Sequence, residues 1–513
     1  MNAISVLNPE GKAPPPAGAC ISHDGGPFPA PPELRDKVCL LDSHILLIAA
    51  GEGMNHGVLA YEDQLARKGF ATTRHLVTMA EVRQRYQETS PLADVLSDMS
   101  AKQGEVIKLI KTAIQMDASD MHFVVSKGVS LLRFRINGEL QTHRDLPEQE
   151  ASLMCSTIYQ SMCDVTSDPI YDRNKPQDGR IKGEFLEAAG LFGVRVATRP
   201  TDRGQLMVLR LLYNRSSKKR QLGELGYLPQ QVAAMHRMTR RKNGVNIFAG
   251  ETGSGKSSSL EVAIRDLIAS FAGQINVLTI EDPPEYRIDG AVQTPKGGGS
   301  WADAIRNAMR LDPDVLMVGE VRDFESAEVA LQGALTGHGL WTTVHANDAV
   351  AILQRLQDFR HGAQRLDPSL YTDPSLVTGL INQALAPVLC PGCKRPWATS
   401  KQNYDPDLVQ RVERLCTPAT VYCTGPGCER CGKSGVVGRT VIAEVIIPNY
   451  AFMRTFRNEG KAEARAYWLT KMGGVSKAKH LIQRINEGLI DPAKGEQKVG
   501  LLDDDELVLE AKA

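Results

Sequence analysis

The chain has 513 residues, more than one ordinary hydrophobic core holds, so we expect two to four domains. Lys and Arg together number 60, as do Asp and Glu, and this balance gives no general electrostatic reason to expect a nucleic-acid partner. No apolar stretch approaches the roughly 18–20 residues that cross a bilayer, and the amino terminus lacks the order of a signal peptide. We therefore expect a soluble cytoplasmic protein that reaches the membrane only through partners.

The amino-terminal part of the chain predicts a tail followed by two modules. Residues 1–35 are rich in proline and glycine, which is typical of a flexible tail. Residues 36–95 combine a strand-like run at 45–50 with a helical pattern and fit a small α/β accessory module. Residues 103–214 open with a helical stretch and then alternate around Asn137-Gly138, a strong hairpin signal. This last segment predicts a sheet-rich α+β domain.

The carboxyl-terminal part, residues 215–513, predicts one larger α/β domain with appendages. After a linker and a leading helix, strand, loop and helix alternate over 243–385, which is the rhythm of a parallel sheet covered by helices. A cysteine-bearing segment covers 386–445, and the pattern is helical from Tyr450 on. The acidic run at 503–506 is most simply a solvated terminus.

The most specific motif is a glycine-rich turn between an apolar run and the start of a helical pattern. Its residues are Gly250, Glu251, Thr252, Gly253, Ser254, Gly255, Lys256 and Ser257. Such a turn lets backbone N–H groups close around a phosphate. Lys256 would reach the β- and γ-phosphates of ATP, and the Ser257 hydroxyl would ligate Mg²⁺. A flexible Gly/Ser turn without a ligand is the alternative, and the flanking strand and helix disfavour it.

Two later predicted strands deliver carboxylates. Glu281 and Glu285 follow an apolar, β-branched run, and the carboxyl ends of parallel strands face the crevice where ligands bind. They would hold Mg²⁺ or orient the attacking water; an acidic turn stiffened by proline is the alternative. Another strand ends in Gly319-Glu320, where the usual phosphate-loop ATPases place Asp before Glu. Direct Mg²⁺ ligation by that Asp is therefore lost, while Glu320 remains placed to polarise water.

A histidine stands at each end of a further, threonine-rich strand. These are His338 and His345. A lone strand histidine is more often a structural residue than a catalytic one. Two of them, in a sheet that already carries a phosphate loop, favour a sensor of the γ-phosphate.

In this order and at these distances, the motifs resemble those of the secretion-ATPase superfamily, which powers type II secretion, type IV pili and related type IV secretion systems. The segments that resemble its Walker A motif, acidic "Asp box", atypical Walker B motif and "His box" are 250–257, 280–285, 312–323 and 336–348. Similar upstream segments are found at 118–122, 133–138, 175–181, 194–196 and 208–212. The resemblance covers residues 103–445. One departure is Gln383-Ala384-Leu385, where the family has Gln-Arg-Leu.

The resemblance implies an α/β fold in which a PAS-like α+β domain precedes a RecA-like P-loop ATPase domain. Family members are ring hexamers that hold ATP between these two domains. Arginines of the first domain then approach the phosphates, and fixed cations there offset the charge of the transferring phosphoryl group. The candidates are Arg195 and Arg210, with Arg180 as a further one. Strand arginines paired with nearby acids are the alternative.

Four cysteines form two Cys-x-x-Cys pairs separated by residues 394–427: Cys390, Cys393, Cys428 and Cys431. Four thiolates in two such turns suit a closed, tetrahedral Zn²⁺ site. Reduced thiols or a redox pair are the alternatives, and Cys416 and Cys423, which lie between the pairs, complicate the ligand assignment. In the resembling family, assembly-type ATPases carry this zinc element, and retraction-type ones generally lack it.

The function that these features predict is ATP hydrolysis that powers a type IV pilus or a type II secretion pseudopilus. The resemblance implies a homohexamer that binds ATP, Mg²⁺ and Zn²⁺ and acts through an inner-membrane platform protein; the thin pilus of a conjugative plasmid is one candidate system. The alternatives are a retraction or type IV secretion ATPase, a RecA-like nucleic-acid translocase, and a non-catalytic zinc scaffold that binds ATP. Neutral charge and the lack of an aromatic-basic groove disfavour nucleic acid. Residues 1–95 match no family module.

Overall fold

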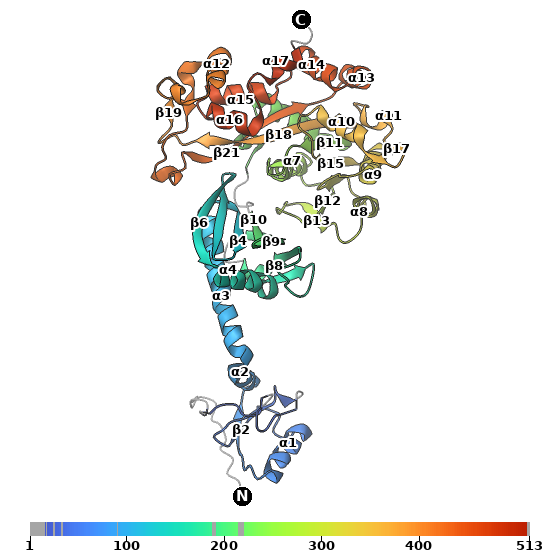
Figure 1. Cartoon of the computed structure of the whole chain (residues 1–513). Coiled ribbons are helices and arrows are strands. Elements are labelled where there is room, and N and C mark those ends of the chain that lie inside the picture. Colours follow the sequence, from blue (N-terminus) through green and yellow to red (C-terminus); the bar gives the residue numbers. More distant parts are fainter. Residues whose placement is uncertain are drawn as a thin grey trace. The chain divides into compact units, whose positions relative to one another are not determined.

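The computed structural model describes residues 16–509 except 17, 24–25, 32–33, 90, 187–190 and 214–219 (Figure 1). The chain divides into two compact units, residues 1–109 with 153–162 and residues 110–152 with 163–513. Residues 1–15 of the expected tail and residues 215–219 of the expected linker lie outside the described residues. Among the described residues, no helix has both the length and the apolarity needed to span a membrane.

The first unit contains a three-stranded sheet in the order β1-β2-β3. Its elements are β1 (Val38–Leu40), β2 (Ile45–Ala49), α1 (His56–Arg67), β3 (Thr73–Val77) and α2 (Met79–Thr89). β1 and β2 are antiparallel, whereas β3 is parallel to β2 because α1 carries the chain back across the sheet. Asn55 caps α1 by accepting from the Gly57 amide. Part of the expected tail packs on this module: Cys20 pairs with Leu41, and Leu34 is buried.

Helix α3 (Pro91–Gln115) leads into a seven-stranded antiparallel sheet with the order β6-β5-β4-β10-β9-β8-β7. The elements are β4 (Ala118–Ser126), β5 (Val129–Ile136), β6 (Glu139–Pro147), α4 (Glu148–Thr157), the π-helix η2 (Ile158–Met162), β7 (Cys163–Thr166), β8 (Gln177–Ile181), the short helix η3 (Gly183–Phe185), β9 (Leu191–Thr201) and β10 (Gly204–Tyr213). Asn137 and Gly138 connect β5 and β6 with φ of 52° and 87°, the pair of positive values that a type I′ turn requires. The predicted hairpin is confirmed, and the sheet around it is antiparallel.

The largest sheet has the order β13-β12-β14-β15-β11-β18-β21. Its strands are β11 (Gly244–Ala249), β12 (Val277–Glu281), β13 (Ala291–Pro295), β14 (Val315–Val318), β15 (Gly339–Val344), β18 (Val377–Leu389) and β21 (Val436–Ile446). Neighbouring strands from β13 to β18 are parallel, and only β18 and β21 are antiparallel. β11, β12, β14 and β15 are buried along their whole length, as expected for parallel strands with both faces covered.

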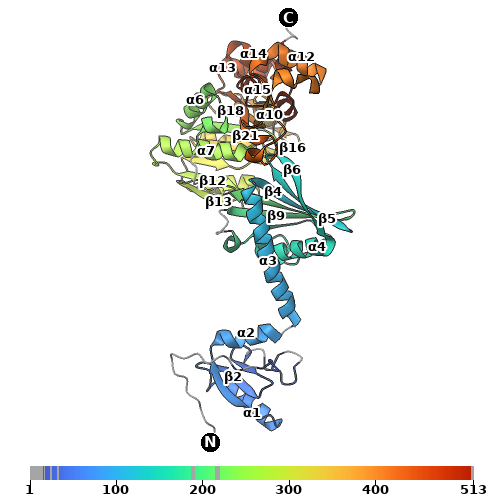
Figure 2. The same ribbon diagram turned by 90° about the vertical axis from the view of Figure 1, so that its left-hand side faces the viewer.

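Helices cover both faces of this sheet. They are α5 (Leu222–Leu225), α6 (Pro229–Thr239), α7 (Lys256–Ser270), α8 (Trp301–Ala308), α9 (Phe324–Leu335) and α10 (Ala351–Asp358). Phe248 and Trp341 pack toward α6 and α7, which lie side by side (Figure 2). Val245 and Ile247, one residue out of step with Phe248, belong to the other core cluster, with α8 and α9. This alternation along β11 divides the core into two layers.

The segment between β18 and β21 forms a small cysteine-bearing subdomain. It contains β19 (Arg395–Pro396), α12 (Pro406–Leu415), β20 (Tyr422–Cys423) and the short helices η6 (Trp397–Thr399), η7 (Lys401–Asn403), η8 (Pro418–Thr420) and η9 (Glu429–Cys431). Before β18 stand β16 (Arg360–His361), β17 (Gln364–Arg365) and α11 (Pro368–Tyr371). The predicted helices after Tyr450 are α13 (Tyr450–Glu459), α14 (Lys461–Lys471), α15 (Lys477–Asn486), α16 (Pro492–Val499) and α17 (Asp504–Leu509).

The acidic run at 503–506 is not a solvated terminus. Its last three residues begin α17, where carboxylates favour the positive end of the helix. Glu506 forms an ion pair with Arg414 at 2.6 Å, and Asp505 is only 8 % exposed and lies 3.3 Å from Arg465. The run therefore joins the carboxyl-terminal helices together.

Candidate functional site

The carboxyl edge of the parallel sheet gathers the motif residues from four strands. Gly250 follows β11, Glu281 ends β12, Glu320 stands two residues after β14, and His345 follows β15. The register aligns the last residues of β11 and β15, and it also aligns the ends of β12 and β14. Since all four strands are parallel, these residues share one edge of the sheet. Ligands of such sheets bind at this edge.

The phosphate loop (residues 250–257) has the backbone that a phosphate cradle needs. Gly250, Gly253 and Gly255 have φ of 145°, 81° and 84°. At Gly250 a Cβ atom would lie 2.3 Å from the Gln383 carbonyl oxygen, so no other residue fits. The loop runs into α7 at Lys256, which aims the free amides of the helix start at the edge of the sheet.

Lys256 and Ser257 stand at the start of α7. Lys256 Nζ donates to the carbonyl oxygens of Gly250 at 2.7 Å and of Glu251 at 3.0 Å. Burial lowers the pKa of Lys256, and the negative charges of Glu320 and Glu285 oppose this shift, which indicates that these carboxylates are close to the ammonium. The Ser257 side chain is exposed, so its hydroxyl is free to approach a bound ion.

A brace under the loop went unrecognised in the sequence. Gln383, on β18, is 1 % exposed and donates from Nε2 to the Ser254 carbonyl oxygen at 2.7 Å. The Tyr227 hydroxyl in turn donates to Gln383 Oε1. The two hydrogen bonds join residues 129 and 156 positions apart, so no local pattern signals them. This chain has Gln383-Ala384-Leu385 where the family has Gln-Arg-Leu, so the glutamine that holds the phosphate loop is kept.

Glu320 lies between two basic side chains. Its Oε2 accepts from Arg322 Nε at 2.8 Å, and its Oε1 lies 3.2 Å from His345 Nε2. Its side chain is 19 % exposed, so water can reach it. Gly319 beside it packs tightly: a Cβ atom there would lie 3.3 Å from the Ile280 carbonyl oxygen and 3.4 Å from the Trp301 ring. A larger side chain at this position would have to displace one of these neighbours by a few tenths of an ångström.

The two acids after β12 differ in their surroundings. Glu281 is 8 % exposed, and its Oε1 accepts from Thr279 Oγ1 at 2.7 Å and from Gln293 Nε2 at 3.0 Å. Burial raises the pKa of Glu281, and these hydrogen bonds oppose the shift. Glu285 is more open and lies 3.9 Å from Arg195 Nη1. Glu281 is thus hydrogen-bonded within the edge of the sheet, whereas Glu285 faces Arg195.

The structure separates His338 from the phosphate loop within one chain. His338 precedes β15, whereas His345 follows it, and Gly339 is aligned with Gly244 at the opposite edge of the sheet. Six residues of strand span about 20 Å. His338 Nδ1 lies 3.0 Å from Thr336 Oγ1 and 3.1 Å from the Gly333 carbonyl oxygen, at the end of α9. Only His345 is brought to Glu320.

The three candidate arginines stand in one row across the antiparallel sheet. Successive cross-strand partners are Arg135, Asp120, Arg210, Arg195 and Arg180. Asp120 is 4 % exposed, and its carboxylate lies 3.0 Å from Arg210 Nε and 3.7 Å from Arg135 Nε. No local sequence pattern indicates that Arg135 and Asp120 belong to this row, because only the strand register places them there.

Arg195 is the member of this arginine row (Arg135, Arg210, Arg195 and Arg180) that contacts the acidic turn after β12. It donates from Nη2 to the Pro283 carbonyl oxygen at 3.0 Å and also to that of Asp282. Burial lowers the pKa of Arg195, and the charges of Glu285 and Asp282 oppose the shift. Arg210 instead pairs with Asp120, which agrees with the alternative that the strand arginines pair with nearby acids.

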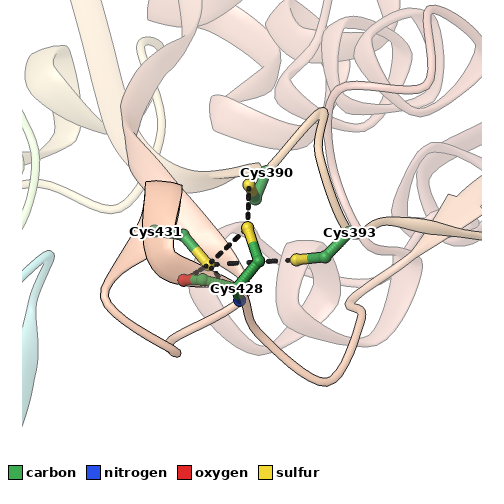
Figure 3. A group of neighbouring side chains, drawn as sticks. All are labelled: Cys390, Cys393, Cys428 and Cys431. Carbon is green, nitrogen blue, oxygen red and sulfur yellow. Dashed lines mark hydrogen bonds between the residues drawn. The ribbon is translucent and has the colours of Figure 1, made fainter.

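The four-cysteine cluster (Cys390, Cys393, Cys428 and Cys431) is assembled as the spacing predicts (Figure 3). Its sulfur atoms all lie within 4.8 Å of one another, and three of their separations are 3.7, 3.8 and 3.9 Å. Backbone amides of Cys428 and Gly435 donate to Cys431 Sγ, each at 3.2 Å, and lower the pKa of the Cys431 thiol to about 6. Cys416 and Cys423 are not members of the cluster.

These separations fit a tetrahedral zinc site. Zn–S bonds of about 2.3 Å place tetrahedral sulfurs about 3.8 Å apart. Gly425 lets the two turns approach each other, since a Cβ atom there would lie 1.6 Å from the Cys393 carbonyl oxygen. The donor set is all sulfur and leaves no open position for catalysis.

Comparison with known proteins gives one consistent result. Residues 97–491 match the family model described as Type II/IV secretion system protein. The Type II secretion system ATPase E of Vibrio cholerae is 33 % identical over 368 residues, which are 70 % of this chain and 68 % of that protein. The Type IV pilus assembly ATPase PilB of Thermus thermophilus is 33 % identical over 356 residues, 68 % of this chain and 38 % of that protein.

A solved structure has a similar fold. The ATPase DotB of Legionella pneumophila superposes with a TM-score of 0.52 over 75 % of this chain and 92 % of that one, at 20 % identity. At this identity the likeness concerns the fold alone. It agrees with the mixed α/β architecture and the preceding antiparallel sheet described above.

Proposed function

The chain belongs to the Type II/IV secretion system protein family, and from this premise we propose that it hydrolyses ATP to ADP and phosphate to power assembly of a type IV pilus or a type II secretion pseudopilus. The observation that carries the proposal is the meeting of the phosphate loop, Glu320 and His345 at one edge of the parallel sheet. Phosphate binding alone would need only the loop. A carboxylate held by a histidine and an arginine beside it is suited to direct a water molecule.

Each residue at the edge has a role in this proposal. Backbone amides of the phosphate loop and Lys256 bind the β- and γ-phosphates, and Ser257 holds the Mg²⁺ that accompanies ATP and neutralises phosphate charge. Glu320 orients the attacking water and accepts its proton. His345, whose Nε2 lies 3.2 Å from Glu320 Oε1, responds to the γ-phosphate. Glu285 helps to hold Mg²⁺ or to orient water, whereas Glu281 stabilises the end of β12.

The arginine row supplies the second half of the site. Arg195 and Arg210 face the phosphates when the PAS-like domain closes on the RecA-like domain, and Arg135 and Arg180 extend the positive surface on either side. The RecA-like assignment is supported by the strand order, in which β15 separates the phosphate-loop strand β11 from the acid-bearing strand β14. Fixed cations at the transferring phosphoryl group stabilise its charge and make turnover depend on closure.

The four-cysteine cluster holds a structural Zn²⁺, which favours an assembly motor over a retraction motor. In the working protein six copies form a ring in the cytoplasm that associates with the inner membrane through a platform protein. Residues before 97, which lie outside the family match, make the contacts specific to this machine. ATP, Mg²⁺ and Zn²⁺ are its ligands, and nucleic acid has no part in the cycle.

The experiment that tests the proposal compares phosphate release by the wild type with that of Lys256→Ala. We expect the variant to lose turnover by at least about 10²-fold, because the transferring phosphates lose their fixed cation. Lys68→Ala, an exposed lysine at the end of α1, is the matched control and keeps wild-type turnover. Tight ATP binding without phosphate release by the wild type would instead identify a non-catalytic scaffold.

A further inference from the structure

Residues 346–349, here named the histidine loop, follow His345 and are held by four different elements. Each of the four residues receives one side chain from elsewhere in the chain. The contacts are Asn382 Nδ2 to the Ala346 carbonyl oxygen at 2.8 Å, Lys477 Nζ to the Asn347 carbonyl oxygen at 2.6 Å, Lys461 Nζ to Asp348 Oδ2 at 2.6 Å, and the Ala349 amide to Glu444 Oε2 at 2.9 Å. Three of these partners come from β21, α14 and α15.

Glu444 is the centre of this arrangement. It is 0 % exposed, and its second oxygen, Oε1, accepts from Arg465 Nη1 at 3.0 Å and from the Lys477 amide at the start of α15 at 3.2 Å. Arg465 also lies 3.3 Å from Asp505, so the carboxyl-terminal helices share the network. A buried carboxylate is tolerated only when it is paired and hydrogen-bonded, as this one is.

The histidine loop is the backbone that directly follows His345. The His345 side chain is 49 % exposed, so few neighbouring side chains pack against its ring. The orientation of the ring therefore depends on its own backbone and on its contact with Glu320. That backbone continues directly into the four anchored residues. A shift of about 1 Å in a catalytic group can lower turnover by about 10²-fold.

We propose that Glu444, together with Arg465, is a positioning residue for the Glu320–His345 pair. It fixes the histidine loop to β21 and to the first residues of α15, and thereby sets the distance between His345 and Glu320. Helix α14 and the start of α15 thus act on the hydrolytic site, although none of their residues touches the phosphate loop among the described contacts. This inference rests on the proposed ATPase function.

Glu444→Gln is the direct test, because it keeps the shape and removes the charge that Arg465 and the two amides share. We expect kcat to fall about tenfold, with KM for ATP within about twofold of the wild type, since Lys256 and Ser257 are untouched. The matched control is Glu496→Gln. Glu496 is also nearly buried and makes a bidentate pair with Arg411, but between α12 and α16. The Glu496→Gln variant is expected to lose about as much folding stability as Glu444→Gln and to keep the wild-type kcat.

A double-mutant cycle separates positioning from general destabilisation. If Glu444 acts through His345, Glu444→Gln adds less than about twofold to the loss already caused by His345→Ala. Fully multiplicative losses would overturn the proposal. Should Glu444→Gln fail to fold, Lys461→Gln serves instead: it removes the partner of Asp348 at a lysine 38 % exposed, and a fall in kcat of about threefold with unchanged KM is expected. An unchanged kcat would overturn the proposal.

Hydrogen exchange of the nucleotide-free full chain tests the anchor without relying on turnover. The peptide that contains Ala349 is expected to exchange about tenfold faster in Glu444→Gln than in the wild type and to be unchanged in Glu496→Gln. Equal protection in all three proteins would overturn the proposal. A wild type without turnover would refute the ATPase function instead, so the two failures are distinguishable.

Discussion

His345 Nε2 lies 3.2 Å from Glu320 Oε1, although the two residues follow different strands of the parallel sheet. Because β14 and β15 are neighbours and parallel, their ends meet, and a carboxylate and an imidazole come into contact beside the phosphate loop. The pair gives the edge of the sheet both an acceptor for a proton from water and a group that can respond to phosphate.

We predict that His345→Ala lowers turnover by about 10-fold to 10²-fold and leaves nucleotide affinity nearly unchanged, because Glu320 loses the partner that orients it. Steady-state phosphate release and binding of a fluorescent ATP analogue measure the two effects. The control is His361→Ala, which removes a similar pair with Glu325, 3.1 Å apart on the surface, and keeps full activity. Weaker binding with unchanged kcat in His345→Ala would contradict the assigned role.

The separate positions of His338 and His345 show where sequence reasoning reaches its limit. The phosphate loop could be predicted because its chemistry lies in eight consecutive residues. The two histidines form an equally compact pattern, but a strand carries its two ends to opposite edges of a sheet. Local spacing predicted the same role for both histidines and could not show that only His345 lies at the edge with Glu320.

Other parts of the site depend on contacts between distant segments. Gln383 braces the phosphate loop and Asp120 holds Arg210 only because the sheets bring these residues together. The amino-terminal segment has the composition of a tail, yet Ala30 and Leu34 are buried in the core of the first unit. Composition does not report such pairings, whereas the strands, the hairpin at Asn137-Gly138 and the cysteine cluster follow from local pattern.

We predict that Arg195→Ala lowers turnover by about 10²-fold, because the site loses a fixed cation that faces the phosphates on closure. Phosphate release at saturating ATP measures the loss. Arg199 lies on the same strand, four residues further on, is exposed, and provides the control Arg199→Ala with unchanged turnover. Equal activity of both variants would refute the role of the arginine row.

The zinc proposal predicts one tightly bound Zn²⁺ for each chain. Cys428→Ser is expected to reduce the zinc content to less than about a tenth, as measured by atomic emission on purified protein, and to lower the thermal unfolding midpoint. Cys416→Ser changes a neighbouring thiol outside the cluster and keeps the metal. Loss of zinc from both variants, or from neither, would contradict the ligand set.

Stability is expected to fall in mild acid because of His480. Burial, aided by the charge of Arg484, lowers the pKa of His480 to about 4, and its Nδ1 accepts from the Ala443 amide at 3.0 Å. The unfolded chain therefore binds more protons than the folded one between pH 4 and about pH 6.5. The stabilisation is complete above pH 6.5 and is lost as the pH falls toward 4.

From these values, His480 lowers the free energy of unfolding by about 2 kcal/mol between pH 7 and pH 5. Urea unfolding at the two pH values measures it. His480→Asn removes the titrating group and should show a pH dependence that is smaller by this amount, whereas His361→Ala should behave as the wild type. An identical pH dependence in His480→Asn would assign the acid sensitivity to other groups.

The central claim, that the edge of the parallel sheet hydrolyses ATP rather than merely binding it, is tested most directly by a single turnover of γ-labelled ATP. With protein in excess and Mg²⁺ present, we expect the wild type to convert the bound ATP to ADP and labelled phosphate. Glu320→Gln is expected to bind ATP equally well and to return most of it intact, because its amide cannot accept the proton of the attacking water. Intact ATP recovered from the wild type, or equal conversion by both proteins, would contradict the account.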